Sequence, residues 1–396
     1  MTVGGMGLPK PDEGRVLQTF LELARIPSPS GHEAGVAAYA RSAFEHVGCE
    51  VVIDDTAAVT GSDTGNLIAT LPGTVPGTIF ITAHMDTMTP ADEIRPQVGE
   101  DGIIRSDGTS VLGGDDKVGI AAAMEVVRVL ASSALPRPEV RVLLTVQEEV
   151  GLVGARALAD DLFDGALTLV CDEPGEPGTV VVTAPFHHTF SATFRGVASH
   201  AAAAPEKGVS AIRMAADAVA AMQLGRIGAD AVANVGTIGG GTADNTVPSE
   251  CTITGECRAF TAESACAVRD AMTACMERAA ADAGGKVDIE WAFQYPGFLI
   301  PVEAASSRLA ERAADACDLP FMRVESLGAT DANMFTLKGA SCLLVATGMK
   351  DFHTTHESLA VRDLVDTARF LLAIICMFGD DAGREAEGLA GAEDTA

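Results

Sequence analysis

The chain has 396 residues, of which 47% are hydrophobic, and its formal net charge is −28 at pH 7. This length predicts more than one domain, and the apolar content is ample for folded cores. The negative charge opposes binding to nucleic acid or to an anionic membrane surface, because phosphate groups would be repelled. An acidic balance also suits plain solubility or salty surroundings, so the charge alone assigns no partner.

The cysteines and the termini bear on the cellular compartment. Nine cysteines, an odd number without a CxxC pair, oppose a disulfide framework or a zinc finger. Residues 1–15 lack the apolar core of a signal peptide. The longest apolar run, 370–378, is too short to span a bilayer and predicts a buried helix. We therefore expect a cytoplasmic protein with no membrane partner.

Strands and helices alternate through the first part of the chain. Apolar runs predict strands over 49–54, 66–71, 78–84, 139–146 and 166–172. Helical periodicity predicts helices over 12–26, 32–47, 117–133 and 154–163. Such alternation is typical of an α/β domain with a largely parallel inner sheet flanked by helices.

The pattern changes near residue 184, where two strand pairs, each with a helix, predict a small α+β unit. The α/β pattern returns with a helix over 301–317 and a strand over 340–347. We therefore predict one α/β domain, interrupted by an inserted α+β domain and followed by a flexible tail. The predicted segments are 1–184 and 297–380 for the α/β domain, 185–296 for the insertion and 381–396 for the tail.

His84 and Asp86 come directly at the end of the predicted strand 78–84. Residues i and i+2 of an extended chain project to the same side, so the aspartate can accept a proton from the histidine. That contact would fix the imidazole tautomer for a metal ion. Taken alone, the pair is more typical of a capped loop histidine.

Further acids and histidines follow the other strands. They are Asp115 and Asp116 at a helix start, Glu148 and Glu149 after 139–146, Asp172 at the end of 166–172, and His353 and His356 after 340–347. Singly, an N-cap explains Asp115 and Asp116, and a surface loop explains His353 and His356. Together, two imidazoles and three carboxylates at the carboxyl ends of strands suit a pair of zinc ions bridged by one aspartate. Such ions would supply the positive charge that the acids lack.

Seven ordered motifs resemble the dinuclear zinc peptidase family that includes peptidase T, glutamate carboxypeptidase and the aminoacylase-type amidohydrolases. The motifs are AHMDT, GGDDKVG, QEEVG, CDEPG, GVASHA, GTADNTVP and FHTTHE, and they span about 20 to 360. FHTTHE and DDK are most similar to the peptidase T-like branch. The resemblance implies a catalytic α/β domain interrupted by a lid domain, and a homodimer formed through that lid.

The resemblance implies a role for each residue that matches a family motif. Asp115 would bridge two Zn²⁺ ions, with Co²⁺ or Mn²⁺ as substitutes. His84 and Asp172 would complete one metal site, and Glu149 and His353 the other.

Two more residues near the metal ligands acquire implied roles. Glu148 would be the general base that moves a proton from water to the leaving amine. Asp86 would orient His84. The peptide bond between Asp115 and Asp116 is expected to be cis, as is common in the family.

The spacing of the last motif favours His353 over His356 as the ligand, because Glu357 follows four residues later. Asp331 is expected in a loop that supports the site.

The predicted lid contributes substrate contacts in this resemblance. His200 would help to hold the developing oxyanion, and Asn245 and Arg258 would bind the substrate carboxylate. From the residues alone, His200 is more typical of a buried or capping histidine, and Arg258 is equally well explained as a structural arginine.

Three functions follow from these patterns. The first is a zinc-dependent exopeptidase of the tripeptidase or aminopeptidase kind, acting on short peptides. The second is an amidohydrolase acting on N-acyl amino acids with the same dinuclear site. The third is a non-catalytic binding protein of the same fold, which the presence of Glu148 and of every implied ligand disfavours.

Overall fold

The computed structural model describes the backbone of residues 2–3 and 6–393, and side chains over 7–383. The chain forms two compact units. Unit 1 comprises Met1–Val182, Ile300–Val324 and Thr330–Ala396, and unit 2 comprises Thr183–Leu299 and Glu325–Ala329. The main boundaries lie within a few residues of the predicted ones, but the short return of the chain to unit 2 at Glu325–Ala329 has no counterpart in the prediction.

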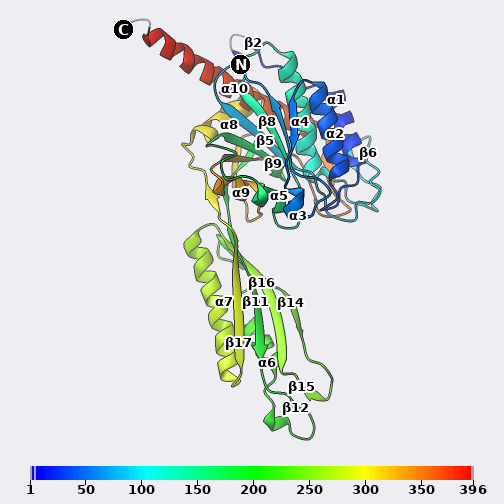
Figure 1. Ribbon diagram of the computed structural model, residues 1–396, viewed down its shortest axis with the longest axis vertical. Helices are drawn as coiled ribbons and strands as arrows, with labels where there is room; N and C mark the ends of the chain where they lie inside the picture. Colours follow the sequence, from blue (N-terminus) through cyan, green and yellow to red (C-terminus); the bar gives the residue numbers. More distant parts are fainter. Residues whose placement is uncertain (1, 4–5, 394–396) are drawn as a thin grey trace. The chain divides into compact units, whose positions relative to one another are not determined.

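Unit 1 is built on a sheet with the strand order β10-β20-β9-β5-β8-β4-β3 (Figure 1). The strands are β3 (Glu50–Ile53), β4 (Leu67–Leu71), β5 (Thr78–His84), β8 (Glu139–Thr145), β9 (Leu167–Glu173), β10 (Thr179–Ala184) and β20 (Ser341–Ala346). The four central strands β20, β9, β5 and β8 are parallel, whereas β4, β3 and β10 pair antiparallel with their neighbours. The predicted α/β fold with a mostly parallel central sheet is confirmed.

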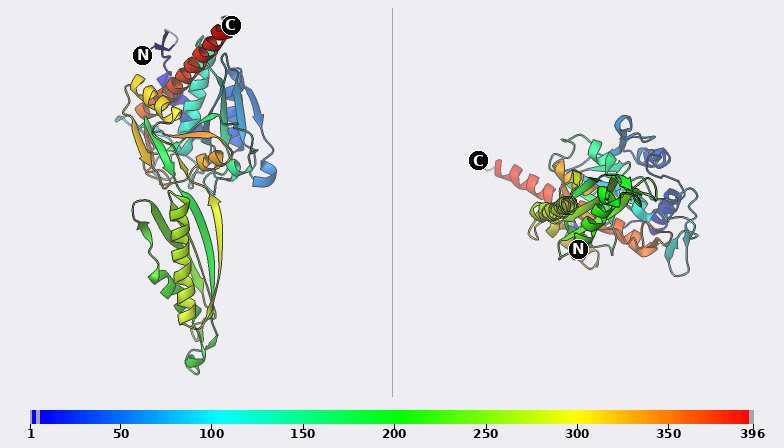
Figure 2. Two further views of the ribbon diagram at one scale, coloured as in Figure 1. Left: turned by 90° about the vertical axis from the view of Figure 1, so that its left-hand side faces the viewer. Right: turned by 90° about the horizontal axis from the view of Figure 1, so that it is seen from below.

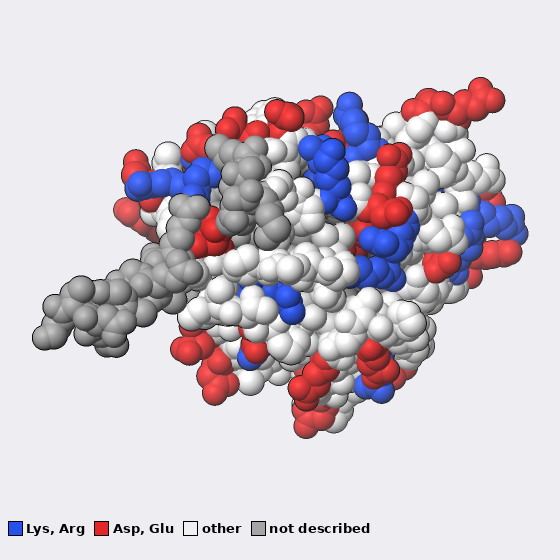
Figure 3. Space-filling view, turned by 90° about the horizontal axis from the view of Figure 1, so that it is seen from above, with Lys and Arg blue, Asp and Glu red and all other residues white. Residues whose placement is uncertain are grey.

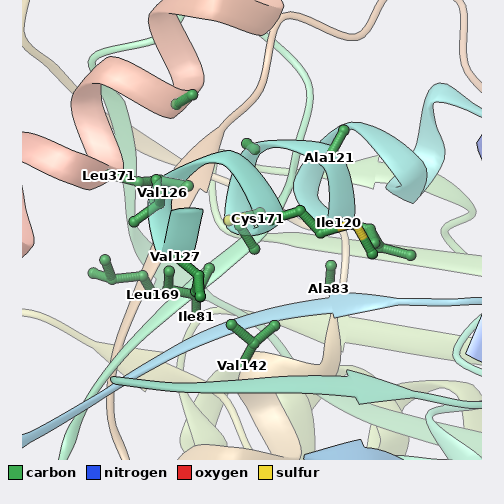
Figure 4. Close-up of a cluster of buried hydrophobic side chains, with 14 of the residues drawn as sticks. Ile81, Ala83, Ile120, Ala121, Val126, Val127, Val142, Leu169, Cys171 and Leu371 are labelled. Atoms are coloured by element: carbon green, nitrogen blue, oxygen red, sulfur yellow. The ribbon is translucent and has the colours of Figure 1, made fainter. Parts of the chain in front are cut away.

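Helices cover this sheet. They are α1 (Glu13–Ala24), α2 (Ala34–His46), α3 (Ala57–Thr60), α4 (Gly114–Ser132), α5 (Val153–Ala157), α8 (Ala305–Ala316), α9 (Asp331–Leu337) and α10 (Val361–Glu393). α4 packs on β5 and β9, and α1 and α10 pack on α4. Ile81 of β5, Val142 of β8 and Leu169 of β9 meet Ile120 and Val127 of α4 in the core (Figure 4). Most side chains of α4 are buried, which explains its alanine- and valine-rich sequence, and its buried charged residues lie mainly in the first turn.

Two helices differ from the sequence prediction. α5 ends at Ala157, short of the predicted end at 163. Its next residue, Leu158, is extended, and the Leu158 carbonyl accepts a hydrogen bond from Lys338 Nζ (2.6 Å) in place of a helical amide. α10 continues as helix to Glu393, into the range where the sequence predicts a flexible tail, and residues 394–396 lie outside the described ones.

Short strands complete unit 1. They are β1 (Thr2–Val3), β2 (Met6–Gly7), β6 (Gln97–Val98), β7 (Ile103–Arg105), β19 (Met322–Glu325) and β21 (Ser358–Ala360). β21, β7 and β6 form a sheet of their own, while β19 pairs with β10.

Unit 2 is an antiparallel sheet of order β13-β14-β16-β11-β17 with two helices packed on it. Its elements are β11 (Phe186–Arg195), β12 (Ser199–His200), a 3₁₀ helix (Pro205–Lys207), α6 (Ala211–Ala221), β13 (Gly225–Ile227), β14 (Ala231–Gly240), β15 (Thr246–Val247), β16 (Glu250–Ala259), α7 (Ala262–Asp282), β17 (Lys286–Tyr295) and β18 (Phe298–Leu299). α7 lies along the long strands (Figure 2). Phe190 and Phe194 of β11, with Met214 and Met276 of the helices, form a separate core.

Charged side chains of both signs lie on one face of the molecule (Figure 3). On the face shown in Figure 3, acidic side chains are interspersed with lysine and arginine. Among the described residues, no helix is long and apolar enough to cross a membrane.

Candidate metal centre and active site

The residues implicated by the sequence in unit 1 converge at the carboxyl ends of the parallel strands. His84 ends β5, Asp172 lies near the end of β9, and Asp115 stands in the first turn of α4. Glu149 follows β8 and His353 follows β20. Because parallel strands end at one edge of a sheet, five residues far apart in sequence meet there.

His84 is buried and oriented by the residue two positions later. Its Nδ1 donates to the backbone carbonyl of Asp86 (2.9 Å), while Oδ1 of the Asp86 carboxylate lies 3.4 Å away. The predicted contact between these residues exists, but the backbone oxygen is the closer acceptor. With its proton on Nδ1, the imidazole has its Nε2 available for a metal ion.

Asp115 stands between the two histidines. Its Oδ1 lies 2.9 Å from His84 Nε2, and its Oδ2 lies 3.1 Å from His353 Nε2. The two oxygens of one carboxylate therefore face different imidazoles, which is the arrangement expected of a bridging ligand. The peptide bond between Asp115 and Asp116 is cis, as predicted.

The remaining acids lie beside the same histidines. Glu149 Oε2 is 2.9 Å from His353 Nε2, and Asp172 Oδ1 is 3.8 Å from His84 Nε2. Ligand atoms of His84, Asp115 and Glu149 lie within 4.8 Å of one another, as do those of His84, Glu148 and Asp172. Glu148 thus lies as close to His84 and Asp172 as a metal ligand would. Its implied role as a base requires the same proximity to the metal site.

The proton affinities of these groups show a strongly negative site. Contacts with Asp115 and Glu149 raise the pKa of His353 to about 10. Burial acts to lower the pKa of His84, but its contacts with Asp115 and Asp86 raise it well above the ordinary value. Burial raises the pKa of Glu148 and of Asp172. Both histidines, Glu148 and Asp172 therefore hold protons more tightly than isolated side chains do. Asp115 is the exception: despite its burial, contacts with His353 and His84 lower its pKa.

The donor set fits divalent metal ions. Two imidazoles and three carboxylates are ligands that zinc, cobalt or manganese accept. Among the described residues, Glu149 Oε1 is buried without a hydrogen-bond partner. A cation would satisfy this orphaned oxygen and offset the negative charge of the cluster.

Glu357 fixes the chain at Asp115 and at the residues just before it. Its Oε2 accepts from the amides of Leu112 (2.7 Å) and Gly113 (2.8 Å), and its Oε1 accepts from the amide of Asp115 (2.9 Å). Burial raises the pKa of Glu357 to about 7. From the sequence, Glu357 serves only to identify His353 as the implied ligand. Its hydrogen bonds could not be predicted, because its partners lie more than 240 residues earlier.

Asp331 lies at the start of α9, where it accepts a hydrogen bond from Thr145 Oγ1 (2.5 Å). Burial raises its pKa to about 7. Asp331 thus lies in a helix and not in the expected loop. Its contact ties α9 to the end of β8, the strand that leads to the paired glutamates.

The substrate-binding candidates all belong to unit 2. The ring Nδ1 of His200 accepts from the amides of Ala202 and Ala203 (both 3.2 Å), which is a capping contact. The backbone carbonyl of Asn245 accepts from the amide of Ala201 (2.9 Å), so Asn245 lies beside the His200 turn.

Arg258 is held by its own unit. Its Nη2 contacts Glu256 Oε2 (3.1 Å), and its Nη1 donates to the carbonyl of Leu327 (3.3 Å). These contacts give His200, Asn245 and Arg258 structural partners and leave their roles toward a substrate as predictions.

Comparison with known proteins extends over most of the chain. Residues 80–376 match the family described as Peptidase family M20/M25/M40. The crystal structure of aminopeptidase PepT from Bacillus cereus ATCC 10987 has 39% sequence identity and a TM-score of 0.87, covering 93% of this chain and 99% of that chain.

Two further proteins are similar over nearly their whole length. A tripeptidase from Staphylococcus aureus subsp. aureus mu50 has 34% identity and a TM-score of 0.89, covering 94% of this chain and 100% of that chain. An uncharacterized Bacillus subtilis protein, YqjE, is 38% identical over 365 residues, which cover 92% of this chain and 98% of that protein.

Proposed function

Because the chain belongs to peptidase family M20/M25/M40, we propose that it is a metal-dependent exopeptidase that hydrolyses the terminal peptide bond of short peptides. Family membership confirms the predicted resemblance and makes the chain a hydrolase of the peptidase class. The observation that carries the proposal is the Asp115 carboxylate facing both His84 and His353, beside the buried Glu148. The similarity to an aminopeptidase and a tripeptidase supports short peptides as substrates.

The metal ligands in this proposal are those that the geometry brings together. They are His84, Asp115, Glu149, Asp172 and His353. When bound, two zinc ions (or cobalt or manganese) supply the positive charge that polarises the scissile carbonyl and acidifies a water molecule.

Glu148 is the proposed general base. It takes a proton from the water and passes it to the nitrogen of the leaving amine. Burial raises the pKa of Glu148 above its ordinary value, so this carboxyl group holds a proton more readily than an exposed glutamate does. No side-chain hydrogen bond within the described residues ties its carboxyl group, so the proton can move.

Asp86 keeps this base in place. Its Oδ1 accepts from the amide of Glu148 (2.9 Å), and its Oδ2 accepts from the amide of Glu149 (3.2 Å). The same residue orients His84, so one buried aspartate couples the proposed base to the proposed ligands.

Unit 2 is proposed as the lid that completes the substrate site and forms a homodimer. His200 would stabilise the developing oxyanion, and Asn245 and Arg258 would bind the carboxylate of the substrate. Since Arg258 already contacts Glu256, a substrate carboxylate would have to share the guanidinium with that residue. We place the enzyme in the cytoplasm.

A substrate survey tests the proposal. Purified protein is loaded with zinc, cobalt or manganese in turn and offered dipeptides, tripeptides, their N-acetylated forms and N-acyl amino acids. Cleavage of unmodified short peptides is expected. Activity on N-acyl amino acids alone would show an amidohydrolase instead, and binding without turnover of any amide would show a non-catalytic protein.

A further inference from the structure

Glu33 is a buried carboxylate that the proposed mechanism does not use. Its side chain is 0% exposed, and no basic side chain of the described residues forms an ion pair with it. Burying a carboxylate without a cation is costly unless hydrogen bonds compensate. The burial of Glu33 therefore indicates a structural or functional role, and its hydrogen bonds indicate what that role is.

Within the described residues, the Glu33 carboxylate accepts three hydrogen bonds, and all of them come from short loops. Oε1 accepts from the amides of Gly31 (2.7 Å) and Gln147 (3.1 Å), and Oε2 accepts from Ser62 Oγ (2.5 Å). The bond to Gln147 crosses 114 positions of the sequence. It joins the segment that precedes α2 to the turn that follows β8.

That turn carries the proposed base, and its backbone is strained. Gln147 has φ of +54°, a left-handed conformation that residues other than glycine rarely adopt. Such a conformation persists only where surrounding contacts hold it. The Gln147 side chain adds one such contact by donating to the carbonyl of Thr60 (3.2 Å).

Three consecutive amides in this turn donate to two buried carboxylates. The amide of Gln147 donates to Glu33, and those of Glu148 and Glu149 donate to Asp86. Ser30 Oγ, three residues before Glu33, donates to Asp86 Oδ2 (2.6 Å). The segment 30–33 thus supports both carboxylates and, through them, the whole turn.

We infer that Glu33 is a positioning residue: it holds the left-handed turn at Gln147 and thereby sets the orientation of Glu148 toward the water. The catalytic part of this inference, the orientation of Glu148, rests on the proposed function. Its structural part, the hold on the turn, is independent of any activity. Glu33 is neither a proposed metal ligand nor the proposed base, and it acts through the backbone of the neighbouring turn.

Three variants of Glu33 separate its hydrogen bonds from its charge. Glu33→Ala removes every acceptor. Glu33→Asp keeps the charge but shortens the side chain, so that the carboxylate no longer reaches the amide of Gln147. Glu33→Gln keeps one carbonyl oxygen for the two amides, while its NH₂ group can donate to the Ser62 hydroxyl, which rotates to accept. We expect Glu33→Gln to behave like the wild type.

A matched control is Glu125→Ala. Glu125 is also 0% exposed, and it binds the amide of Asp12 (2.8 Å) and the guanidinium of Arg15 (Nε at 2.6 Å) away from the turn. Its loss should lower thermal stability without altering the turn. Comparing the two alanine variants separates general destabilisation from a specific effect on Glu148.

The experiment combines hydrogen exchange, metal content and kinetics. In Glu33→Ala and Glu33→Asp, mass spectrometry of a peptide covering 144–152 should show at least tenfold faster amide exchange than in the wild type. With a substrate peptide, kcat should fall about 10- to 100-fold with KM changed less than about threefold, because a misplaced base affects chemistry more than binding. Metal content should stay at the wild-type level, and Glu33→Gln should restore both readouts.

Other outcomes would overturn the inference. These are unchanged exchange over 144–152 in both Glu33→Ala and Glu33→Asp, or an equal loss of kcat in Glu125→Ala. If Glu33→Ala fails to fold, Glu33→Asp decides. Because exchange is measured without substrate, an inactive wild-type protein would refute the proposed function and still leave the hold of Glu33 on the turn open to confirmation or refutation.

Discussion

Replacing Glu357 by alanine should destabilise the protein and weaken its metal site together. The carboxylate is 2% exposed and accepts three backbone amides, from Leu112, Gly113 and Asp115. Each buried amide that loses its acceptor costs about 1–3 kcal/mol. The lower end of that range for all three gives a loss of about 3 kcal/mol in the free energy of unfolding, because water entering the vacated space would satisfy part of the need.

Glu357→Gln should be harmful as well, although the change is small. The native carboxylate uses both oxygens on backbone donors, so a carboxamide must turn its NH₂ group toward at least one amide. We expect a loss of about 1–3 kcal/mol for that mismatch. This contrasts with Glu33, where one of the two oxygens faces a hydroxyl that can accept.

Glu357→Ala should also make Asp115, a proposed metal ligand, less well ordered. Because Glu357 holds the amide of Asp115, its loss frees the carboxylate that faces both histidines, and metal affinity should fall about 10- to 100-fold. Thermal unfolding of the metal-free protein measures the first effect, with a Tm about 4–5 °C below the wild type. Competition with a chromophoric chelator measures the second.

A surface glutamate supplies the control for this experiment. Glu311 pairs with Arg323 (3.0 Å) while its side chain is 55% exposed, so Glu311→Ala should change stability by less than about 1 kcal/mol. A Glu357→Ala variant with the Tm and metal affinity of Glu311→Ala would refute the reasoning.

Two further predictions concern the proposed second metal site and unit 2. His353→Ala removes the imidazole 2.9 Å from Glu149, so mass spectrometry should find about one tightly bound metal ion per chain in place of about two; an unchanged content would contradict the proposed ligand pairing. In unit 2, contact with His187 lowers the pKa of Glu256 to about 2, below its ordinary 4.5. The stabilisation from Glu256 is therefore complete above pH 4.5 and lost as the pH falls through 2. Discounted for the exposed third of the side chain, it amounts to about 2 kcal/mol, which Glu256→Gln should remove. Fluorescence of Trp291, the single tryptophan, would follow the acid titration, and parallel profiles for variant and wild type would refute this prediction.

The central strands and the cluster of acids and histidines could be predicted because each is marked by a short stretch of sequence. Apolar runs mark β5, β8 and β9, and each run is followed by an acid or a histidine within a few residues. Strand β10, with the sequence TVVVTA, was not predicted, because it comes directly after β9 with no helix between them. It pairs antiparallel, so it breaks the alternation on which the sequence prediction relied.

The supporting contacts were harder to predict because they join distant segments. Glu33, Glu357 and Lys338 each bind backbone groups more than 100 residues away. The periodicity of apolar residues in the sequence does not predict such hydrogen bonds. The end of α5 illustrates the consequence: helical propensity favours continuation, but a tertiary bond from Lys338 takes the carbonyl of Leu158.

The paired glutamates provide the most direct test of the proposed mechanism. Glu149 faces His353, whereas Glu148 is buried near His84 and Asp172 with a raised pKa. Turnover of a short peptide by Glu148→Gln is measured together with the metal content of the variant. The two measurements distinguish a general base at position 148 from a metal ligand there. We predict that kcat falls by about 10²- to 10⁴-fold while about two metal ions per chain remain bound. Turnover within about tenfold of the wild type at equal metal content would contradict the assignment of Glu148 as the base.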